Sequence, residues 1–290
     1  MAQYLDPKND LVFKRIFGEH PDLLVSFLNA LMPLEKGNII ESVEYLSPEL
    51  VPDNPLKKYS IVDVRCKDNH GRFFIVEMQM EWSSIFMKRM LLNAAKVYSS
   101  QLGKGKDFEL LQPVYTLAIL NKNFDAETEE FYHRYQLINR QNTDEVIEGL
   151  EMIFVELQKF KPESLIDRKI AVLWLRFLKE VNEENAWVSD ELLENPDICR
   201  AVDICEKGGF TDAELAIYDK YWDNISTEIS VISNSFREGK AEGKAEGKAE
   251  GKAEVVIESH KAGLPVDTIA VITRLTPDQI TSILKEQGLL

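Results

Sequence analysis

The sequence predicts an α/β protein in which a mixed sheet lies between layers of helices. The first 120 residues predict this class, because their apolar residues are spaced as in a helix, three strands, a helix and a further strand, in that order. The last of these segments, 114–120 (VYTLAIL), is apolar throughout, as in a strand buried on both faces. With 290 residues, the chain is long enough to bury a sizeable core.

The chain begins with two predicted helices and three predicted strands. Apolar residues at helical spacing indicate two short helices at 8–17 and 23–31, or one broken helix, with Pro21 at the break and Pro33 after the second stretch. Strand-like runs follow at 39–46, 59–66 and 73–80. The turn-rich stretch 67–71 (KDNHG) predicts that the last two strands form a hairpin.

The next helix is predicted from Ser83 or Ser84, which can cap it, to about Leu102, with Gly103 as its end. The residues expected on its buried face are Met87, Leu91, Ala94, Ala95, Tyr98 and Leu102. Pro113 then introduces the strand at 114–120. Residues 131–138 and 152–157 either extend the sheet or are helical, since their spacing fits both.

From Pro162 to about Tyr221 the pattern is helical, and Thr211 with Glu214 fits a capping box. The expected parts of the chain are a core with its extension at 1–160, a helical subdomain at 161–225, a repeat-bearing helix at 226–262 and a small helical tail at 263–290.

A repeat of Gly-Lys-Ala-Glu occurs four times from Gly239 to Glu254. Ala, Glu and Lys favour helix, but each glycine costs about 1 kcal/mol relative to alanine and the four-residue period places like charges at i and i+4. We therefore expect a helix that associates with a second copy, so that lysines meet glutamates and the small residues allow close approach. The alternative is a flexible exposed spacer.

The tail from Val255 to Leu290 predicts three short helices, the first ending at Gly263 and the third starting at Thr276 with Pro277 and Gln279. The spacing resembles a helix-turn-helix. The last helix contains one lysine and no arginine, however, so a plain packing unit is the alternative to a DNA-reading tail.

The net charge of −15, from 34 basic and 49 acidic residues, is unevenly distributed. Residues 1–120 carry 14 basic and 15 acidic side chains, so the acidity lies in the remainder and the first part is not excluded from binding phosphate groups. The N-terminus lacks the features of a secretion signal, and no apolar run is long enough to cross a membrane. Three cysteines without CxxC spacing are typical of a reducing compartment, and we expect a cytoplasmic protein.

Two neighbouring strands each carry a carboxylate inside an apolar run: Asp63 in Tyr59–Cys66 and Glu77 in Arg72–Met80. Burying such groups is costly without compensation, which a shared cation would provide. Glu77 and Gln79 point the same way, and the hairpin can bring Asp63 beside them. These oxygens, a carbonyl such as that of Met78, and water would suit Mg²⁺ or Mn²⁺.

The alternative to a metal site is an ordinary ion pair. Its basic partners would be Arg65, Lys67 or Arg72. Nothing in the spacing of the carboxylates decides between a cation and an ion pair.

Asp63, followed by a short hairpin and then Glu77-Met-Gln79, resembles the Asp…(Glu/Asp)-x-Lys signature of PD-(D/E)XK nucleases, with Gln in the last position. A longer ordered set resembles the Rpn family of recombination-promoting nucleases and transposase-like proteins over essentially the whole chain, most strongly over 4–121. Its motifs are Asp10-Leu-Val-Phe-Lys14-Arg-Ile-Phe17, Ile75-Val-Glu77-Met-Gln79, Arg89 with Tyr98, Gln112-Pro-Val-Tyr115, and the Gly-Lys-Ala-Glu repeat.

This resemblance implies a restriction-endonuclease-like α/β/α core, followed by a helical C-terminal region, that cuts DNA with a divalent cation: Mg²⁺, Mn²⁺ or Ca²⁺. Asp63 and Glu77 match the metal-binding carboxylates, and Asp10 is a further candidate ligand. Gln79 matches the lysine position as a third catalytic residue, but it cannot carry positive charge, so water activation would depend more on the metal or on another lysine such as Lys67.

Basic side chains of the predicted helices are candidates to hold DNA phosphates. They are Lys14, Lys88, Arg89 and Lys96, and for each the alternative is a solvated helix face. The sequence therefore predicts a metal-dependent DNA endonuclease, linked to recombination, mobile elements or defence, that forms homo-oligomers through the repeat region. The alternative is a catalytically weak DNA-binding or assembly protein with the same fold.

Overall fold

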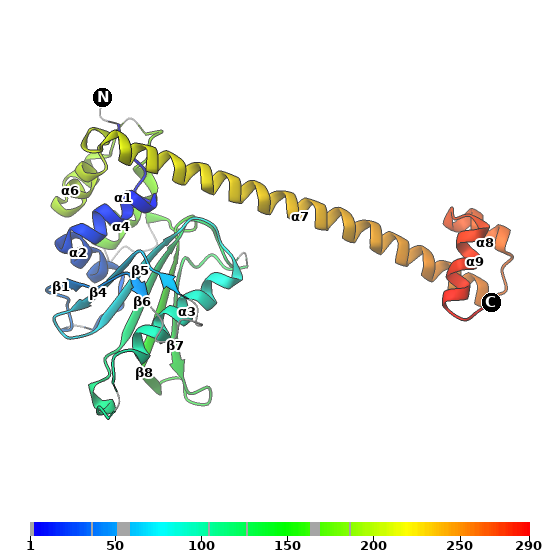
Figure 1. Ribbon diagram of the computed structural model, residues 1–290, viewed down its shortest axis with the longest axis horizontal. Coiled ribbons are helices and arrows are strands. Elements are labelled where there is room, and N and C mark those ends of the chain that lie inside the picture. Colours follow the sequence, from blue (N-terminus) through cyan, green and yellow to red (C-terminus); the bar gives the residue numbers. More distant parts are fainter. Residues whose placement is uncertain are drawn as a thin grey trace. The chain divides into compact units, whose positions relative to one another are not determined.

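The computed structural model describes residues 3–35, 37–50, 59–103, 105–125, 127–162, 169–185 and 187–290. They fall into two compact units, Met1–Ile225 and Ser226–Leu290. The larger unit is a six-stranded sheet with helices on both faces, which confirms the predicted α/β class with a mixed sheet (Figure 1). Among the described residues, no helix has the length and hydropathy needed to cross a membrane.

The six-stranded sheet has the order β1-β4-β5-β6-β8-β7. Its strands are β1 (Val43–Tyr45), β4 (Val64–Asp68), β5 (Phe73–Gln79), β6 (Val114–Leu120), β7 (Tyr132–Ile138) and β8 (Val146–Glu156). The central strands β5, β6 and β8 are parallel, whereas β4 and β7 pair antiparallel on either side of them. Strand β6 is therefore buried on both faces, as its sequence predicts.

The structure resolves the ambiguity of residues 131–138 and 152–157, which lie in β7 and β8. Two expected strands are shorter than predicted. The run at 39–46 pairs only at Val43–Tyr45, and the run at 59–66 is interrupted, giving the two-residue strand β3 (Ser60–Ile61) before β4. Strand β3 pairs with β2 (Glu49–Leu50) in a separate two-stranded sheet.

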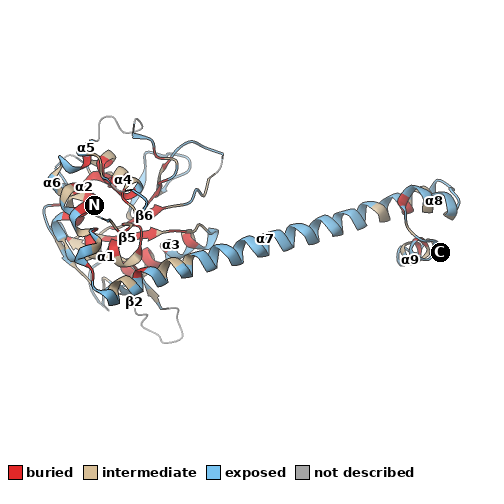
Figure 2. Cartoon of the chain, turned by 90° about the horizontal axis from the view of Figure 1, so that it is seen from above, coloured by how far each residue is buried: buried red, intermediate tan, exposed pale blue. Residues whose placement is uncertain are grey.

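The two faces of the sheet are covered by different helices because strand side chains alternate. Phe74, Val76 and Met78 of β5 pack into a core shared with α1 (Asp10–Glu19), α2 (Pro21–Leu31), α4 (Lys169–Glu180) and α6 (Pro196–Ile204). On the opposite face, Ile75 packs with α3 (Ser84–Ser99). Figure 2 shows the buried residues of this unit gathered between the sheet and its helices.

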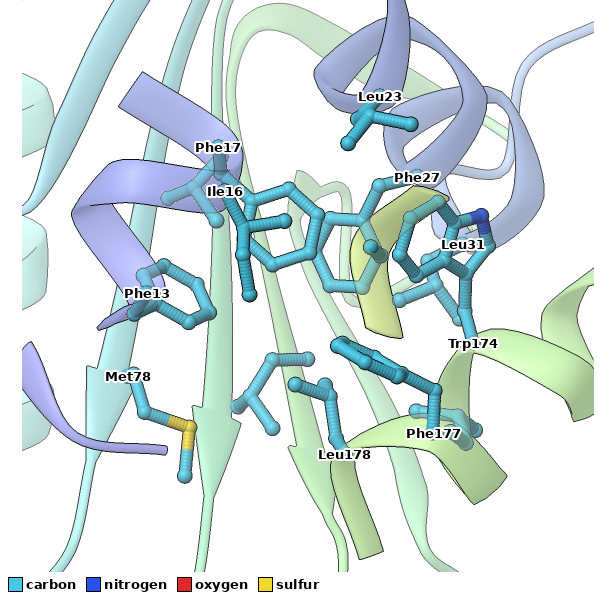
Figure 3. Packing of buried hydrophobic residues seen from close by; sticks show 14 of the residues in the cluster. Phe13, Ile16, Phe17, Leu23, Phe27, Leu31, Met78, Trp174, Phe177 and Leu178 are labelled. Atoms are coloured by element: carbon cyan, nitrogen blue, oxygen red, sulfur yellow. The ribbon is translucent and has the colours of Figure 1, made fainter. Parts of the chain in front are cut away.

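Residues of α4 complete the core around α1 and α2 (Figure 3). The ring of Trp174 lies 5.4 Å from that of Phe17 and 5.5 Å from that of Phe27, and its indole N–H donates to Ser26 Oγ at 3.2 Å. The described part of 161–225, for which we predict a helical subdomain, packs into the same core as the N-terminal helices. Leu5 N also donates to Cys205 O at 2.8 Å, which ties the N-terminus to the end of α6.

The buried face predicted for α3 was partly wrong. The structure buries Phe86, Met90, Asn93, Ala94 and Val97, whereas Leu91 is 46% exposed. The predicted face was rotated around the helix, since it included Leu91 and left out the buried Phe86, Met90 and Val97. Because Asn93 is polar, it was not considered, although it lies at helical spacing from Met90 and Val97.

Beyond α5 (Asp190–Leu193), α6 and a short 3₁₀ turn, the chain enters α7 (Asp212–Lys261). The predicted capping box is present, since Thr211 N donates to Glu214 Oε2 at 2.7 Å and Glu214 N donates to Thr211 Oγ1 at 3.3 Å. The repeat is helical as predicted and exposed along α7. The segment expected to start a short helix at Val255 instead forms the end of α7.

The C-terminal unit has a small core of its own at the end of α7. Helices α8 (Val266–Thr273) and α9 (Pro277–Glu286) bury Ile269, Ile280 and Leu284 against Val256. Thr276 and Gln279 form the predicted capping box at the start of α9.

Gly149 lies in a bulge of β8, where Glu151 faces Gln136 but Ile147 already faces Leu137. Its φ of +150° disfavours any side chain, and an added Cβ would lie 3.2 Å from atoms of the Tyr98 ring. Gly149→Ala is therefore expected to destabilise the larger unit by about 1–3 kcal/mol.

Thermal unfolding followed by tryptophan fluorescence checks this prediction, since all four tryptophans lie in Met1–Ile225. Gly103→Ala is the control, because nothing lies within 4 Å of the added atom there. Equal melting temperatures for the two variants would contradict the expected strain.

Candidate active site

The two candidate carboxylates lie together where strand pairing begins. Strands β4 and β5 pair with Val64 opposite Val76, so Asp63, in the gap between β3 and β4, comes next to Glu77. Asp63 Oδ2 accepts a hydrogen bond from Met78 N at 2.7 Å, which fixes its carboxylate against β5. The predicted hairpin therefore brings the two acids to one place.

Glu77 is held by two residues of α3. Arg89 Nη2 donates to Glu77 Oε2 at 3.2 Å and to Gln79 Oε1 at 2.9 Å, so Glu77 and Gln79 point the same way, as predicted. Asn93 Nδ2 donates to Glu77 Oε1 at 3.4 Å. Asn93 is fully buried, and its Oδ1 has no hydrogen-bond partner among the described residues.

Asp63 faces the first helix. Lys14 Nζ lies 3.9 Å from Asp63 Oδ1 and 2.7 Å from Asp10 Oδ1. The ammonium thus stands between Asp10 and Asp63, and Asp10 reaches the carboxylate pair through Lys14.

Burial makes both acids difficult to ionise. It raises the pKa of Asp63 to about 6, and the Asp10 charge adds to the rise, while the hydrogen bond from Met78 N opposes it. Burial likewise raises the pKa of Glu77 to about 7, with the Asp63 charge as a second cause and Arg89 acting against it. Lys14 and Arg89 therefore do not fully compensate the two buried charges.

The side chains present fit a divalent cation of the oxygen-preferring kind. Two buried carboxylates, the amide oxygen of Gln79 and the unpartnered Oδ1 of Asn93 are all hard oxygen donors. A cation would compensate the two negative charges whose burial raises both pKa values. The donors are not a carboxylate cluster: within the described ranges, no group of three His, Cys, Asp or Glu side chains is placed to hold a metal ion.

The other basic candidates lie in different settings. Lys96 Nζ donates to Ser60 Oγ at 2.7 Å and so contacts the short strand β3, while Lys88 is exposed on α3. Lys67, suggested as a substitute lysine, lies at the other end of the β4–β5 pairing, opposite Phe73, and its ammonium is 5.7 Å from the centroid of that ring.

The ion pairs of the two acids also differ from those considered in the sequence. Their basic partners are Lys14 and Arg89 from the helices. Arg72 instead pairs with Asp68, and Arg65 Nη1 donates to Ser47 O at 3.4 Å.

Sequence reasoning missed Asn93. The signal that could have identified it is a polar residue within the apolar spacing Met90, Asn93, Val97, because a buried amide on such a face needs a polar partner. The bridging position of Arg89 between Glu77 and Gln79 was also missed, although Arg89 itself was a candidate phosphate ligand.

Comparison with known families gives a match over most of the chain. The model of a family described as PD-(D/E)XK nuclease family transposase matches residues 7–234, a range that includes the whole site. Comparisons with curated proteins and with solved structures give no match. The matched range, the mixed sheet and the paired acids at the start of the hairpin agree, and the chain belongs to the PD-(D/E)XK nuclease family transposases.

Proposed function

We propose that this chain is a divalent-metal-dependent DNA endonuclease whose cation is held by Asp63 and Glu77. The observation that carries the proposal is the placement of two acids with raised pKa values side by side in a largely buried site. When bound, Mg²⁺ or Mn²⁺ would supply charge that polarises a phosphoryl oxygen and makes a water more acidic. Asp10 is the third acid near the site, and the ammonium of Lys14 lies between it and Asp63.

The residues of the chain have separate tasks in this proposal. Met78 N holds Asp63, and Asn93 holds Glu77, so both carboxylates are oriented before a cation binds. Arg89, whose side chain is 44% exposed, would turn from Glu77 to a DNA phosphate once a cation neutralises the acids. Lys88 and Lys96 on the same helix are further candidates to contact the phosphates.

The proposal is tested by incubating supercoiled plasmid with the full chain and Mg²⁺ or Mn²⁺. We expect nicked and linear products with wild type, none with EDTA, and none with Asp63→Ala. Binding without cleavage would favour the catalytically weak DNA-binding protein, for which the neutral Gln79 is the supporting observation. Equal product from wild type and Asp63→Ala would exclude the proposed site.

We also propose that α7 forms a dimer with a second copy of the chain, which would provide the two active sites that a double-strand cut needs. Ile225, Ile229, Ile232 and Phe236 follow the 4-3-4 spacing of a coiled-coil seam. Ile229, Ile232 and Phe236 are 38%, 50% and 71% exposed, which is unusual for a stripe of large apolar residues.

The repeat contributes less to this seam than its sequence suggests. At 3.6 residues per turn, a four-residue period advances by about 40° more than one turn per repeat, so the glycine, lysine and glutamate stripes wind around α7. The apolar residues 225–236 therefore make the contact, while mixed charges along the repeat let two helices lie close together without net repulsion.

Light scattering tests this dimer. Wild type is expected at twice the 33.3 kDa of one chain, and Ile232→Glu with Phe236→Glu is expected at the mass of one chain. Val231→Glu is the matched control, because Val231 is 59% exposed and lies off the seam. If the doubly substituted chain is still a dimer, the seam is refuted. Deletion of the repeat at 239–254, which lies outside the seam, is expected to leave the dimer intact.

A further inference from the structure

Lys14 is the ammonium group beside the carboxylate pair, and its position is well fixed. On α1, the residues on either side of it, Phe13, Ile16 and Phe17 among them, are buried in the core. Asp10, one helical turn earlier, accepts from Lys14 Nζ at 2.7 Å and keeps the ammonium directed toward Asp63. Its side chain is still 38% exposed, so solvent and substrate can reach it.

The two oxygens of Asp63 have different surroundings. Oδ2 accepts from Met78 N at 2.7 Å, whereas Oδ1 faces Lys14 Nζ at 3.9 Å. A distance of 3.9 Å is too long for a strong hydrogen bond but leaves the ammonium close enough to act on any atom that approaches Oδ1.

Gln79 cannot provide a positive charge at this place, and its hydrogen-bonding groups are already used. Its Oε1 accepts from Arg89 Nη2 at 2.9 Å, and its Nε2 donates to Glu81 O at 2.8 Å. Arg89 in turn is engaged on the Glu77 side of the pair. Among the described residues, Lys14 is thus the basic group that lies beside Asp63 Oδ1.

We propose that Lys14 is a catalytic residue of the phosphodiester hydrolysis: its ammonium stabilises the negative charge that develops on the attacking water oxygen beside Asp63. This inference rests on the proposed function. Asp10 is then a positioning residue that orients Lys14.

The reaction balances without any further reactant. The water oxygen forms a bond to phosphorus, and the bond from phosphorus to the leaving deoxyribose oxygen breaks. The proton of the water passes to solvent, and the leaving oxygen takes up a proton from solvent. Lys14 gives up no proton; it contributes fixed positive charge next to the oxygen that becomes negative.

The test compares Lys14→Met and Lys14→Arg with wild type, and uses the exposed Lys106→Met as a matched control. Under single-turnover conditions, with plasmid and Mg²⁺, we expect Lys14→Met to cleave about 10²–10³-fold more slowly, the range typical for loss of one charge-stabilising donor. Lys14→Arg keeps the charge and should recover most of this loss, and Lys106→Met should cleave as wild type does.

Two readouts that do not depend on cleavage accompany the rates. DNA affinity, measured with EDTA present, should change less than about threefold in Lys14→Met, since one exposed phosphate contact is worth little. The affinity for Mn²⁺, measured by calorimetry without DNA, should rise several-fold, because a cation 3.9 Å from Asp63 is removed.

The outcomes separate the two proposals. Wild-type cleavage that Lys14→Met leaves unchanged would overturn the role of Lys14 alone. A loss of DNA affinity as large as the loss of rate would also overturn it, because Lys14 would then be a phosphate ligand. A wild-type chain that does not cleave would overturn the proposed function and this inference together, even if Mn²⁺ binds.

Discussion

Glu77→Gln is expected to reduce metal-dependent cleavage by at least about 10³-fold and, at pH 8, to make the protein more stable. The substitution keeps the shape of the side chain, and its one amide oxygen can still accept from Arg89. Its NH2 group then faces Asn93, whose amide must turn so that the unpartnered Oδ1 accepts in place of the Nδ2 donor. What it removes is a negative charge on a side chain that is 5% exposed. That charge would help to bind a cation. When no cation is bound, its burial lowers the stability of the folded protein.

The sign of the stability effect follows from the pKa of Glu77, about 7 in the folded chain against an ordinary value of 4.5. Between these values the folded protein keeps a proton that the unfolded chain has lost, so stability falls as pH rises through this window and stays low above it. The glutamine variant has no such loss. We expect an advantage of about 1–3 kcal/mol at pH 8 that disappears toward pH 4.5.

Melting temperatures of wild type and Glu77→Gln from pH 4.5 to pH 8, in EDTA, measure this effect. Each kcal/mol corresponds to roughly 2–4 °C for a unit of this size. Glu109→Gln, at an exposed position, is the control and should show no pH-dependent difference from wild type. A glutamine variant that melts lower than wild type at pH 8 would contradict the buried-charge account, and one that cleaves DNA would remove Glu77 from the site.

The affinity for Mn²⁺ is expected to fall steeply below pH 7, because the cation must displace the protons of both acids. With pKa values of about 6 and 7 for Asp63 and Glu77, the fraction of sites with both groups ionised falls by roughly 20-fold from pH 8 to pH 6 and by roughly 10³-fold from pH 8 to pH 5. The metal-binding constant should follow this fraction.

Calorimetric titration of the metal-free chain with Mn²⁺ at pH 5, 6, 7 and 8 checks the dependence, and at pH 6 buffers of different ionisation enthalpy count the protons released. We expect between one and two protons at pH 6 and close to none at pH 8. Glu77→Gln should bind more weakly at every pH and with a shallower slope. An affinity that is constant from pH 6 to pH 8 would show that the cation does not compete for these two acids.

The proximity of Asp63 and Glu77 could be predicted because it is local. A short turn joins their strands, and alternation along a strand decides which residues face the same way. The break between β3 and β4 at Asp63 could not be predicted, because strand propensity continues through Tyr59–Cys66. The break arises from a change of pairing partner: β3 pairs with β2, whereas β4 pairs with β1 and β5.

The partners of the two acids come from helices, and sequence patterns do not say how a helix is rotated against a sheet. Arg89 and Asn93 reach Glu77 only because Met90 and Val97 set the buried face of α3. Lys14 reaches Asp63 because α1 packs on the side of β4. In both cases the apolar core decides where the charges lie, and neither contact has a sequence signature of its own.

Because α4 packs against α1 and α2, only a gene fragment that includes α4 is expected to encode a correctly folded site. Trp174 packs against both Phe17 and Phe27, so a gene fragment that ends after β8 would expose those rings and leave α1, the helix that carries Asp10 and Lys14, without this support. The segment that carries the candidate acids is therefore not expected to fold correctly when it is transferred without α4. Recombination between genes would have to carry the chain through α4 for the transferred piece to retain a working arrangement of acids and bases.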